Sequence, residues 1–235
     1  EVITTPLTFV ATAEAIIAVG ATPVFADIEP RTLNLCPRAA AMAITAKTEA
    51  MIVVHLYGLP CDMAAFTALA REKGLKLIED CAHALGAVYA GRPAGSFGAA
   101  AAHSFFPSKV LGAYGDGGMV CVRGTAGAEQ VRLLRTHGSR KKYHPEVAGY
   151  NSRLDTLQAA ILLAKLGWLD ESLRGRRQAA AWYDELLAGA AGIELLATPA
   201  GSVSSNYAYT VRVKNRDRVA EQLKNNGVPT MVYYP

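Results

Sequence analysis

The amino-acid sequence predicts an α/β protein in which helices cover both faces of a mostly parallel sheet. Short apolar runs rich in β-branched residues alternate along the chain with segments whose apolar residues recur every three to four positions. This alternation is typical of parallel strands joined by helical crossovers. Of the 235 residues, 51% are hydrophobic and 19% are charged, a composition that supports a sizeable core and excludes a disordered chain.

The expected strands and helices follow one another from the first residue. Buried strands are expected at Val2–Thr4, Val24–Asp27, Met51–His55, Leu75–Ile78, Ala101–Phe105 and Met119–Val122. Helices are expected between them at Phe9–Val19, Pro37–Ile44, Asp62–Glu72 and Ala126–Leu134. Asp62 is a suitable N-cap, and Gly20 and Gly74 stand where helices end. Ligands of such sheets usually bind beyond the carboxyl ends of the strands.

The pattern changes from Arg153 onward. A helical stripe runs through Leu154, Leu157, Ile161, Ala164 and Trp168 and continues, with a break expected near Leu173, to Leu187. A strand at Tyr207–Val213, a helix at Asp217–Asn226 and a strand at Pro229–Tyr234 are then expected to form a βαβ unit. We predict a large domain over residues 1–152, a long linking helix region over 153–190 and the start of a small C-terminal α+β domain over 191–235.

The two ends of the chain lie close to expected strands. The chain opens at Glu1 without a methionine, directly in a strand-like run, and stops at Pro235 just after another such run. We therefore expect a chain that is truncated at both ends, with the N-terminal part of the large domain missing and the small domain incomplete.

Charge, cysteines and hydropathy narrow the class of protein. The formal net charge is +4, from 24 Lys and Arg against 20 Asp and Glu, which is too small for the basic face of a nucleic-acid-binding protein. The four cysteines are scattered without CxxC or zinc-type spacing, so we expect no metal site and a reducing, cytoplasmic setting. No apolar stretch approaches the roughly 20 residues that span a bilayer, and no secretory leader is seen. These features favour a soluble protein without a membrane partner.

The segment Ser104-Phe-Phe-Pro-Ser-Lys109 places a lysine just after an expected strand, ahead of four glycines that end at Gly118. A lysine in a turn is usually a solvated charge. Here the aromatic, apolar and glycine neighbours let the backbone pack closely around the amine, and desolvation lowers the pKa of an amine toward the nucleophilic free base. The segment therefore favours a lysine that forms a Schiff base.

Asp80 ends a buried strand, at the edge of the sheet where ligands bind. A carboxylate there is costly unless it has a cationic or hydrogen-bonding partner. An N-cap for the following turn is one explanation, and a partner for a protonated pyridine nitrogen is another. His83, three residues on, is close enough to face the same pocket, although a single histidine is more often structural.

With these residues in place, the sequence resembles the DegT/StrS-type nucleotide-sugar aminotransferases. The segments that carry the resemblance are Glu1–Thr12, Ile78–Ala84, Ser104–Lys109, Gly115–Gly118 and Asn151–Ile161, and it extends over essentially the whole chain. The resemblance implies a pyridoxal 5'-phosphate-dependent transferase of the aspartate-aminotransferase-like fold, called fold type I. Within the family, the sequence is most similar to enzymes that aminate UDP-linked keto sugars, including keto-uronic acids.

The resemblance also implies a role for each of five residues near the cofactor. Lys109 would bind the cofactor covalently and act as the catalytic acid and base, while Asp80 would pair with the pyridine nitrogen. His83, where many relatives have glutamine, would contact the ring hydroxyl. Ser104 would bind the cofactor phosphate, and Phe9 would stack on the ring, although packing at the start of a helix explains Phe9 equally well.

Other residues are implied to act across a subunit boundary or on the substrate. Asn151 would reach the cofactor phosphate of a neighbouring subunit, which implies a homodimer with shared active sites. Arg153 and Tyr234 would contact the sugar nucleotide, while Tyr233 stands where relatives often have histidine. The basic run over residues 135–142 would suit a diphosphate, but a solvated loop explains it at least as well, so it is not counted among the site residues.

The function that the resemblance implies is transfer of an amino group, from L-glutamate, to a keto-sugar nucleotide in the biosynthesis of cell-surface polysaccharides or amino sugars. A sugar dehydratase on the same fold is one alternative, but such relatives replace the lysine with histidine. A pyridoxal enzyme that acts on amino acids is disfavoured by the continuous match. A regulator or binding protein that kept the fold is the remaining alternative. The family's upstream phosphate-binding helix start is not found, so a chain of these residues alone is expected to bind cofactor weakly.

Overall fold

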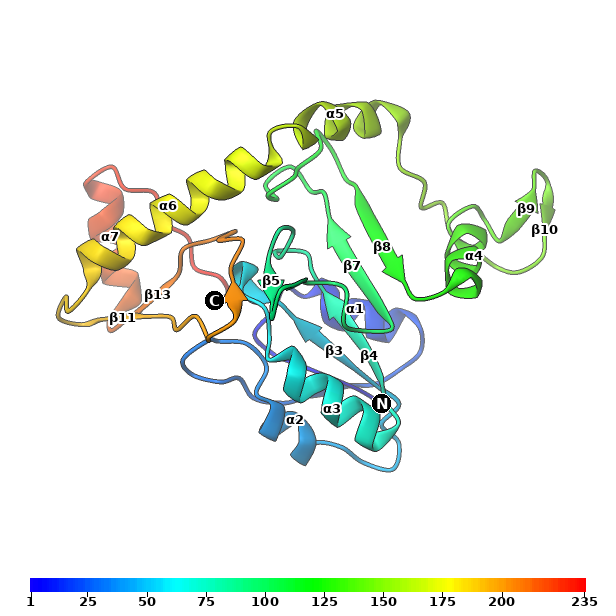
Figure 1. The fold of residues 1–235 in the computed structure, drawn as a ribbon, viewed down its shortest axis with the longest axis horizontal. Coiled ribbons are helices and arrows are strands. Elements are labelled where there is room, and N and C mark those ends of the chain that lie inside the picture. Colours follow the sequence, from blue (N-terminus) through cyan, green and yellow to red (C-terminus); the bar gives the residue numbers. More distant parts are fainter.

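The computed structural model describes residues 1–235 and contains a six-stranded sheet in the order β2-β1-β3-β4-β7-β8. Strands β3, β4, β7 and β8 of this sheet are labelled in Figure 1. The strands are β1 (Val2–Thr4), β2 (Pro23–Phe25), β3 (Ala50–Val54), β4 (Lys76–Asp80), β7 (Ala100–Ser104) and β8 (Gly118–Val122). All neighbours pair in parallel except β8, which runs antiparallel to β7 at one edge. The predicted mostly parallel sheet is thus confirmed.

Three helices connect strands of the sheet, α1 (Ala11–Ala18), α2 (Pro37–Met42) and α3 (Met63–Lys73), and a fourth, α4 (Thr125–Leu134), follows β8. Asp62 caps α3 as predicted, because its side chain accepts a 3.0 Å hydrogen bond from the Ala65 N–H. Gly74 ends α3 with a φ of 68°, a left-handed conformation that favours glycine. Since β1-α1-β2 and β3-α3-β4 step in opposite directions along the sheet, right-handed crossovers place α1 and α3 on opposite faces.

The main hydrophobic core lies between the parallel strands and the α2–α3 layer. Its members include Ile3, Met51, Val53, Phe66 and Leu77, all of them at most 5% exposed. The strand residues among them alternate with residues of the opposite face, as the period of two requires. This core holds β1, β3 and β4 in register, and these strands lead to the site described below.

Two helices lead away from the sheet, α5 (Thr156–Leu166) and α6 (Leu169–Leu187), and α6 extends across to the C-terminal segment (Figure 1). The helix is interrupted at Gly167 and Trp168, so the helix break predicted near Leu173 was wrong. Glycine is a poor helix former, whereas Leu173 is 5% exposed and lies within the continuous α6. No helix in the structure combines the length and the apolarity needed to cross a bilayer.

The C-terminal segment differs from the predicted βαβ unit. Strand β13 (Val211–Val213) pairs antiparallel with β11 (Ile193–Leu195), and α7 (Arg216–Asn225) follows. The strand predicted at Pro229–Tyr234 was wrong, since this stretch contains no strand. One reason is that the Tyr233 carbonyl accepts a hydrogen bond from the Tyr57 hydroxyl rather than from a neighbouring strand.

Several very short ladders were not predicted from the sequence. Strands β5 (Val88–Tyr89), β6 (Arg92–Pro93) and β12 (Ser202–Val203) form one small sheet, and β9 (Ser139–Lys141) pairs with β10 (His144–Pro145). The β5–β6 hairpin turns through Ala90 and Gly91, with φ values of 46° and 76°, as a two-residue turn with positive φ requires. Pairing of β12 with β5 ties the C-terminal segment to the stretch between β4 and β7.

Candidate active site

A cleft of about 730 Å³ opens beyond the carboxyl ends of β1, β3, β4 and β7. The structure brings six of the predicted site residues together on its walls: Phe9, Asp80, His83, Ser104, Lys109 and Tyr234. They come from segments up to 225 residues apart, between Phe9 and Tyr234 (234 − 9). Their convergence follows from the topology, because parallel strands end at one edge of a sheet.

Lys109 lies in the loop after β7, where its N–H donates a 2.8 Å hydrogen bond to the Phe106 carbonyl. The loop is tightly packed, because a Cβ on Gly112 would lie 2.3 Å from the Pro107 carbonyl oxygen. The Lys109 amine sits 4.8 Å from the centre of the Tyr207 ring. Burial lowers the pKa of Lys109, and the nearby Tyr207 and Asp80 only partly oppose the shift. The amine is therefore closer to the free base that a nucleophile or general base needs.

Asp80 closes β4 and directs its carboxylate into the cleft. Oδ2 accepts a 2.8 Å hydrogen bond from the Thr12 hydroxyl, and Oδ1 accepts a 3.0 Å hydrogen bond from the Ala82 N–H. The hydrogen bond from the N–H of Ala82, two residues on, agrees with a role for Asp80 in capping the following turn. The position of Asp80 on the cleft wall agrees with a role in binding a ligand. Both roles are compatible, since a carboxylate offers about four lone-pair sites.

His83 is 6% exposed and held from two sides. Its Nδ1 accepts a 3.3 Å hydrogen bond from the Tyr57 N–H, and its ring stacks on Tyr207 with centres 4.1 Å apart and an angle of 15°. Burial, with a contribution from the Lys109 charge, lowers the pKa of His83 to about 3. A neutral ring whose Nδ1 accepts must carry its proton on Nε2. His83 thus presents a fixed N–H donor.

This depressed pKa predicts a pH-dependent stability that glutamine at position 83 would remove. The unfolded histidine takes up a proton below its ordinary pKa of 6.5, whereas the folded one does so only near 3, so stability is full above 6.5 and is lost as pH falls. Between pH 7.5 and pH 5, the free energy of unfolding of the wild type should fall by about 2 kcal/mol more than that of His83→Gln. Urea unfolding at several pH values measures this difference, and parallel curves for the two proteins would contradict it.

Ser104 and the aromatic residues complete the walls. The Ser104 hydroxyl oxygen accepts a 3.2 Å hydrogen bond from the Phe106 N–H, and this leaves its O–H free to donate to an anion. The Phe9 ring is 58% exposed, although it stands at the start of a helix that was expected from its apolar residues. The centre of this ring lies 6.2 Å from that of the Tyr234 ring. An exposed aromatic ring beside charged groups offers a flat surface to a planar ligand.

Two cleft residues that contact the predicted ones, Tyr207 and Thr12, were not predicted. Tyr207 stacks on His83, and its hydroxyl lies 3.3 Å from that of Ser108, while Thr12 donates a hydrogen bond to Asp80. The buried Tyr57, whose N–H donates to His83, was not predicted either. The one sequence feature that could have pointed to Thr12 is its hydroxyl, which stands four residues after that of Thr8 at the start of an apolar helix. Nothing local marks Tyr207, because its partners are more than 90 residues away in sequence (207 − 109 = 98 for Lys109).

Two predicted residues lie away from this cleft. Asn151 and Arg153 are exposed and absent from the cleft walls. The backbone of Asn151 forms an isolated antiparallel β-bridge with Thr136, just after α4. The basic run over residues 135–142 is largely exposed and continues into the β9–β10 hairpin, which extends beyond α4 at the far end of the molecule (Figure 1). None of these residues lines the cleft of its own chain.

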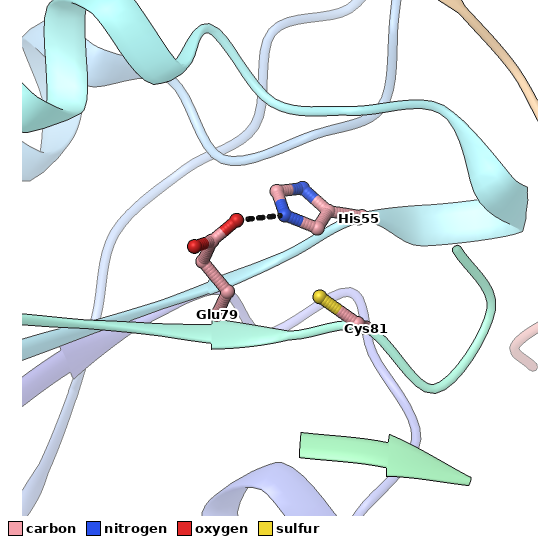
Figure 2. Close-up of side chains that lie close together, drawn as sticks. All are labelled: His55, Glu79 and Cys81. Carbon is pink, nitrogen blue, oxygen red and sulfur yellow. Dashed lines mark hydrogen bonds and ion pairs between the residues drawn. The ribbon is translucent and has the colours of Figure 1, made fainter. Parts of the chain in front are cut away.

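A second group of titratable side chains lies behind the cleft. The donor atoms of His55, Glu79 and Cys81 lie within 4.8 Å of one another, and Figure 2 shows His55 directed toward Glu79. His55 Nδ1 accepts a 3.0 Å hydrogen bond from the Cys61 N–H, so its Nε2–H donates the 3.0 Å bond to Glu79. Both ring nitrogens are therefore used within the protein, as a structural role requires.

Glu79 is the centre of this buried group. Its two oxygens accept N–H bonds of 2.7, 2.7 and 2.6 Å from Gly95, Phe97 and Gly98, in addition to the bond from His55. Burial alone would raise the pKa of Glu79, but the hydrogen bonds from His55 and these amides outweigh it and lower that pKa. The charged form fixes the loop that leads into β7, and β7 leads to Ser104 and Lys109.

Comparison with known proteins gives consistent results. The model of the DegT/DnrJ/EryC1/StrS aminotransferase family matches residues 1–235. The chain is 50% identical to a pleiotropic regulatory protein of Geobacillus stearothermophilus and 48% identical to a UDP-N-acetyl-3-dehydro-alpha-D-glucosamine 3-aminotransferase of Acidithiobacillus ferrooxidans. It is 46% identical to a UDP-2-acetamido-2-deoxy-3-oxo-D-glucuronate aminotransferase of Pseudomonas aeruginosa. All of this chain is covered in each case, but only 64%, 63% and 65% of the relatives' lengths.

Solved structures agree with these relatives. The chain is similar to S. venezuelae DesV in complex with a ketimine intermediate, with a TM-score of 0.96 and 44% identity over 100% of this chain and 63% of that one. It is also similar to the sugar aminotransferase CalS13 from Micromonospora echinospora, with a TM-score of 0.93 and 33% identity over 99% of this chain and 66% of that one.

Proposed function

Because the chain belongs to the DegT/DnrJ/EryC1/StrS aminotransferase family, we propose that it performs pyridoxal-phosphate-dependent transfer of an amino group from L-glutamate to a keto-sugar nucleotide. The expected family and the expected fold of pyridoxal-phosphate-dependent transferases are both confirmed. Since the chain spans less than two thirds of the relatives named above, the activity is proposed for the protein as a whole. The convergence of Lys109, Asp80 and His83 on one cleft is the observation that supports it.

The donor set of the cleft fits this cofactor. Asp80 offers a carboxylate to a protonated ring nitrogen, and His83 offers a neutral N–H to the ring oxygen. Ser104 retains a free O–H for a phosphate oxygen, and Phe9 provides an exposed aromatic surface. Lys109 supplies an amine whose pKa is already lowered by burial. Each polar part of pyridoxal phosphate thus has a complementary residue.

When bound, pyridoxal phosphate supplies an electron-withdrawing ring that can take up and release an amino group. Lys109 would hold the cofactor through its amine and, once displaced by the amino donor, move a proton to and from the reacting carbon. Asp80 would keep the ring nitrogen protonated, and His83 would orient the ring through Nε2–H. The same lysine would act in both half-reactions, first with glutamate and then with the keto sugar.

The proposed acceptor is a UDP-linked 3-keto amino sugar or its uronate. The two aminotransferase relatives quoted above bear names of this kind, at 48% and 46% identity. Tyr234 lines the cleft and would contact the sugar, while Tyr233 beside it replaces the histidine expected from the family. Products of this class supply amino sugars to cell-surface polysaccharides. The four free cysteines fit a reducing cytoplasm as the place of the reaction.

We further propose that two copies of the chain share their active sites. Asn151 and Arg153 are exposed and outside their own cleft, as expected of residues that serve a neighbouring subunit. Asn151 would then reach the partner's cofactor phosphate and Arg153 its sugar nucleotide.

A regulatory role is the second candidate, because the relative at 50% identity is named a pleiotropic regulatory protein. A regulator without chemistry has no need of a desolvated lysine beside an aspartate in a cleft, so the presence of both Lys109 and Asp80 favours the enzyme.

The proposed function is tested by the absorption spectrum of the full gene product mixed with pyridoxal phosphate. We expect a visible band from cofactor bound to Lys109, and L-glutamate should replace it with a near-ultraviolet band. Adding a UDP-linked keto sugar should then restore the visible band and yield an aminated sugar, detected by mass. Absence of a protein-dependent band in excess cofactor would contradict the enzyme and favour the regulator.

A further inference from the structure

A chain of hydroxyl groups leads from the start of α1 to Asp80. The Thr8 and Thr12 hydroxyl oxygens are 3.0 Å apart, and the Thr12 hydroxyl lies 2.8 Å from Asp80 Oδ2. Thr12 is 5% exposed, and both threonines line the cleft. The contact joins residues 68 positions apart, so it exists only in the folded domain.

The direction of these hydrogen bonds follows from the chemistry of the groups. A carboxylate accepts only, so Thr12 must donate to Asp80. A hydroxyl has a single proton, and with that proton given to Asp80 the Thr12 oxygen can only accept from Thr8. Acceptance of one hydrogen bond strengthens the next in such a chain. The result is a donor aimed at one oxygen of the aspartate.

The second oxygen of Asp80 is held independently. Oδ1 accepts the Ala82 N–H at 3.0 Å, from the turn that follows β4, while Oδ2 is held from α1. Two donors on different oxygens stop rotation of the carboxylate about its terminal bond. Without the Thr12 hydroxyl, only the Ala82 N–H would orient the group.

We propose that Thr12 is a positioning residue for Asp80, whose hydroxyl fixes the carboxylate in the orientation that receives a protonated ring nitrogen in the cleft. This inference rests on the proposed function, since pyridoxal phosphate is the ligand that brings such a nitrogen. Thr12 itself exchanges no proton with substrate and acts only through Asp80. Thr8 supports it one step further away.

A buried threonine elsewhere provides a matched control. Thr4 is fully buried in β1, and its hydroxyl donates a 3.0 Å hydrogen bond to the Ile52 carbonyl, away from Asp80. Thr4→Val and Thr12→Val therefore remove the same chemical group and the same number of donated hydrogen bonds. Only Thr12→Val removes a bond to the aspartate.

The first readout is the equilibrium dissociation constant of pyridoxal phosphate, measured by absorption in the full gene product. Thr12→Val should raise this constant by about tenfold or more, because a hydrogen bond to a charged group is lost. Thr12→Ser keeps the hydroxyl and should restore most of the affinity. Thr4→Val should change the constant by less than about twofold, because the site is independent.

The second readout does not involve the cofactor. In cofactor-free protein, the effects of Thr12→Val and Asp80→Ala on the urea unfolding midpoint should be non-additive, because each substitution removes the same hydrogen bond. The effects of Thr4→Val and Asp80→Ala should add.

The outcomes separate the two proposals. Unchanged cofactor affinity in Thr12→Val, or an equal loss in Thr4→Val, would overturn the positioning role while wild-type spectra still support the enzyme. Additive effects of Thr12→Val and Asp80→Ala would overturn the hydrogen bond itself. A wild-type protein that binds no pyridoxal phosphate would remove the proposed function and this inference with it, even if the unfolding cycle showed the hydrogen bond.

Discussion

Replacing Lys109 with alanine should lower the rate of amino transfer by about a thousandfold or more, because the substitution removes both the amine that binds the cofactor and the acid–base group. The fold should be retained, since the Lys109 side chain faces the cleft rather than the core. Steady-state turnover with L-glutamate and a UDP-linked keto sugar measures the loss.

Two measurements separate lost chemistry from lost binding in Lys109→Ala. Borohydride treatment of the wild type should attach the cofactor to the peptide that contains Lys109, as seen by mass spectrometry, and should attach none in the variant. Lys76, exposed at the opposite end of β4, provides the control, and Lys76→Ala should retain activity and labelling. Activity in Lys109→Ala within about tenfold of wild type would contradict the assignment.

The same variant tests whether subunits share their sites. Asn151 lies outside its own cleft, so an inactive Asn151→Ala subunit paired with an inactive Lys109→Ala subunit should form one intact site. Mixed dimers should therefore regain activity that neither variant has alone. Mixed dimers that form without gaining activity would show that each site is built from one chain.

The parts of the fold that sequence predicted are those governed by local patterns. The six sheet strands and the cap at Asp62 follow from apolar runs and capping preferences within a few residues. The irregular stretch at 229–234 depends on packing against a distant segment, through the hydrogen bond from the Tyr57 hydroxyl to the Tyr233 carbonyl. The two-residue ladders are too short to leave a periodic pattern.

The candidate site likewise contains residues that local sequence patterns predicted and residues that depend on distant contacts. Lys109 and Asp80 could be predicted because Asp80 ends a strand, and Lys109 follows one, at the ligand-binding edge of the sheet. Tyr207 could not, because it reaches His83 from a segment 124 residues away (207 − 83) through the docking of the C-terminal region. The protonation pattern of His83 also required the structure, because it depends on the Tyr57 backbone N–H.

Removing the charge of Glu79 should strongly destabilise the protein, at a cost of about 3 kcal/mol in the free energy of unfolding. The side chain is fully buried, and its oxygens accept four hydrogen bonds that join β4 to His55, the residue after β3, and to the loop before β7. Glutamine is nearly isosteric, but its NH₂ group would face backbone N–H donors that need an acceptor. The substitution thus leaves donors unpaired rather than merely weakening a bond.

The same loop is held from its other side, which makes Glu79 one half of a clamp. The Arg123 guanidinium donates hydrogen bonds of 2.8, 3.0 and 2.8 Å to the carbonyls of Ser96, Phe97 and Gly98. Glu79 accepts hydrogen bonds from the backbone N–H groups of the loop, and Arg123 donates hydrogen bonds to its carbonyls. The loop is therefore held in one conformation, which fixes where β7 begins. Loss of the Glu79 carboxylate should therefore loosen β7 and the loop that holds Lys109, even though the hydrogen bonds of this side chain go to His55 and to the loop before β7.

Urea unfolding of Glu79→Gln against the wild type tests this clamp, with Glu72→Gln as control. Glu72 is an exposed glutamate whose pair with Lys73 should contribute less than about 0.5 kcal/mol. Because the pKa of Glu79 is lowered in the folded protein, its contribution is full above the ordinary carboxyl pKa and is lost as pH falls through the lowered value. The two curves should thus approach each other in acid. A Glu79→Gln protein as stable as Glu72→Gln at neutral pH would show that the buried charge does not hold the loop.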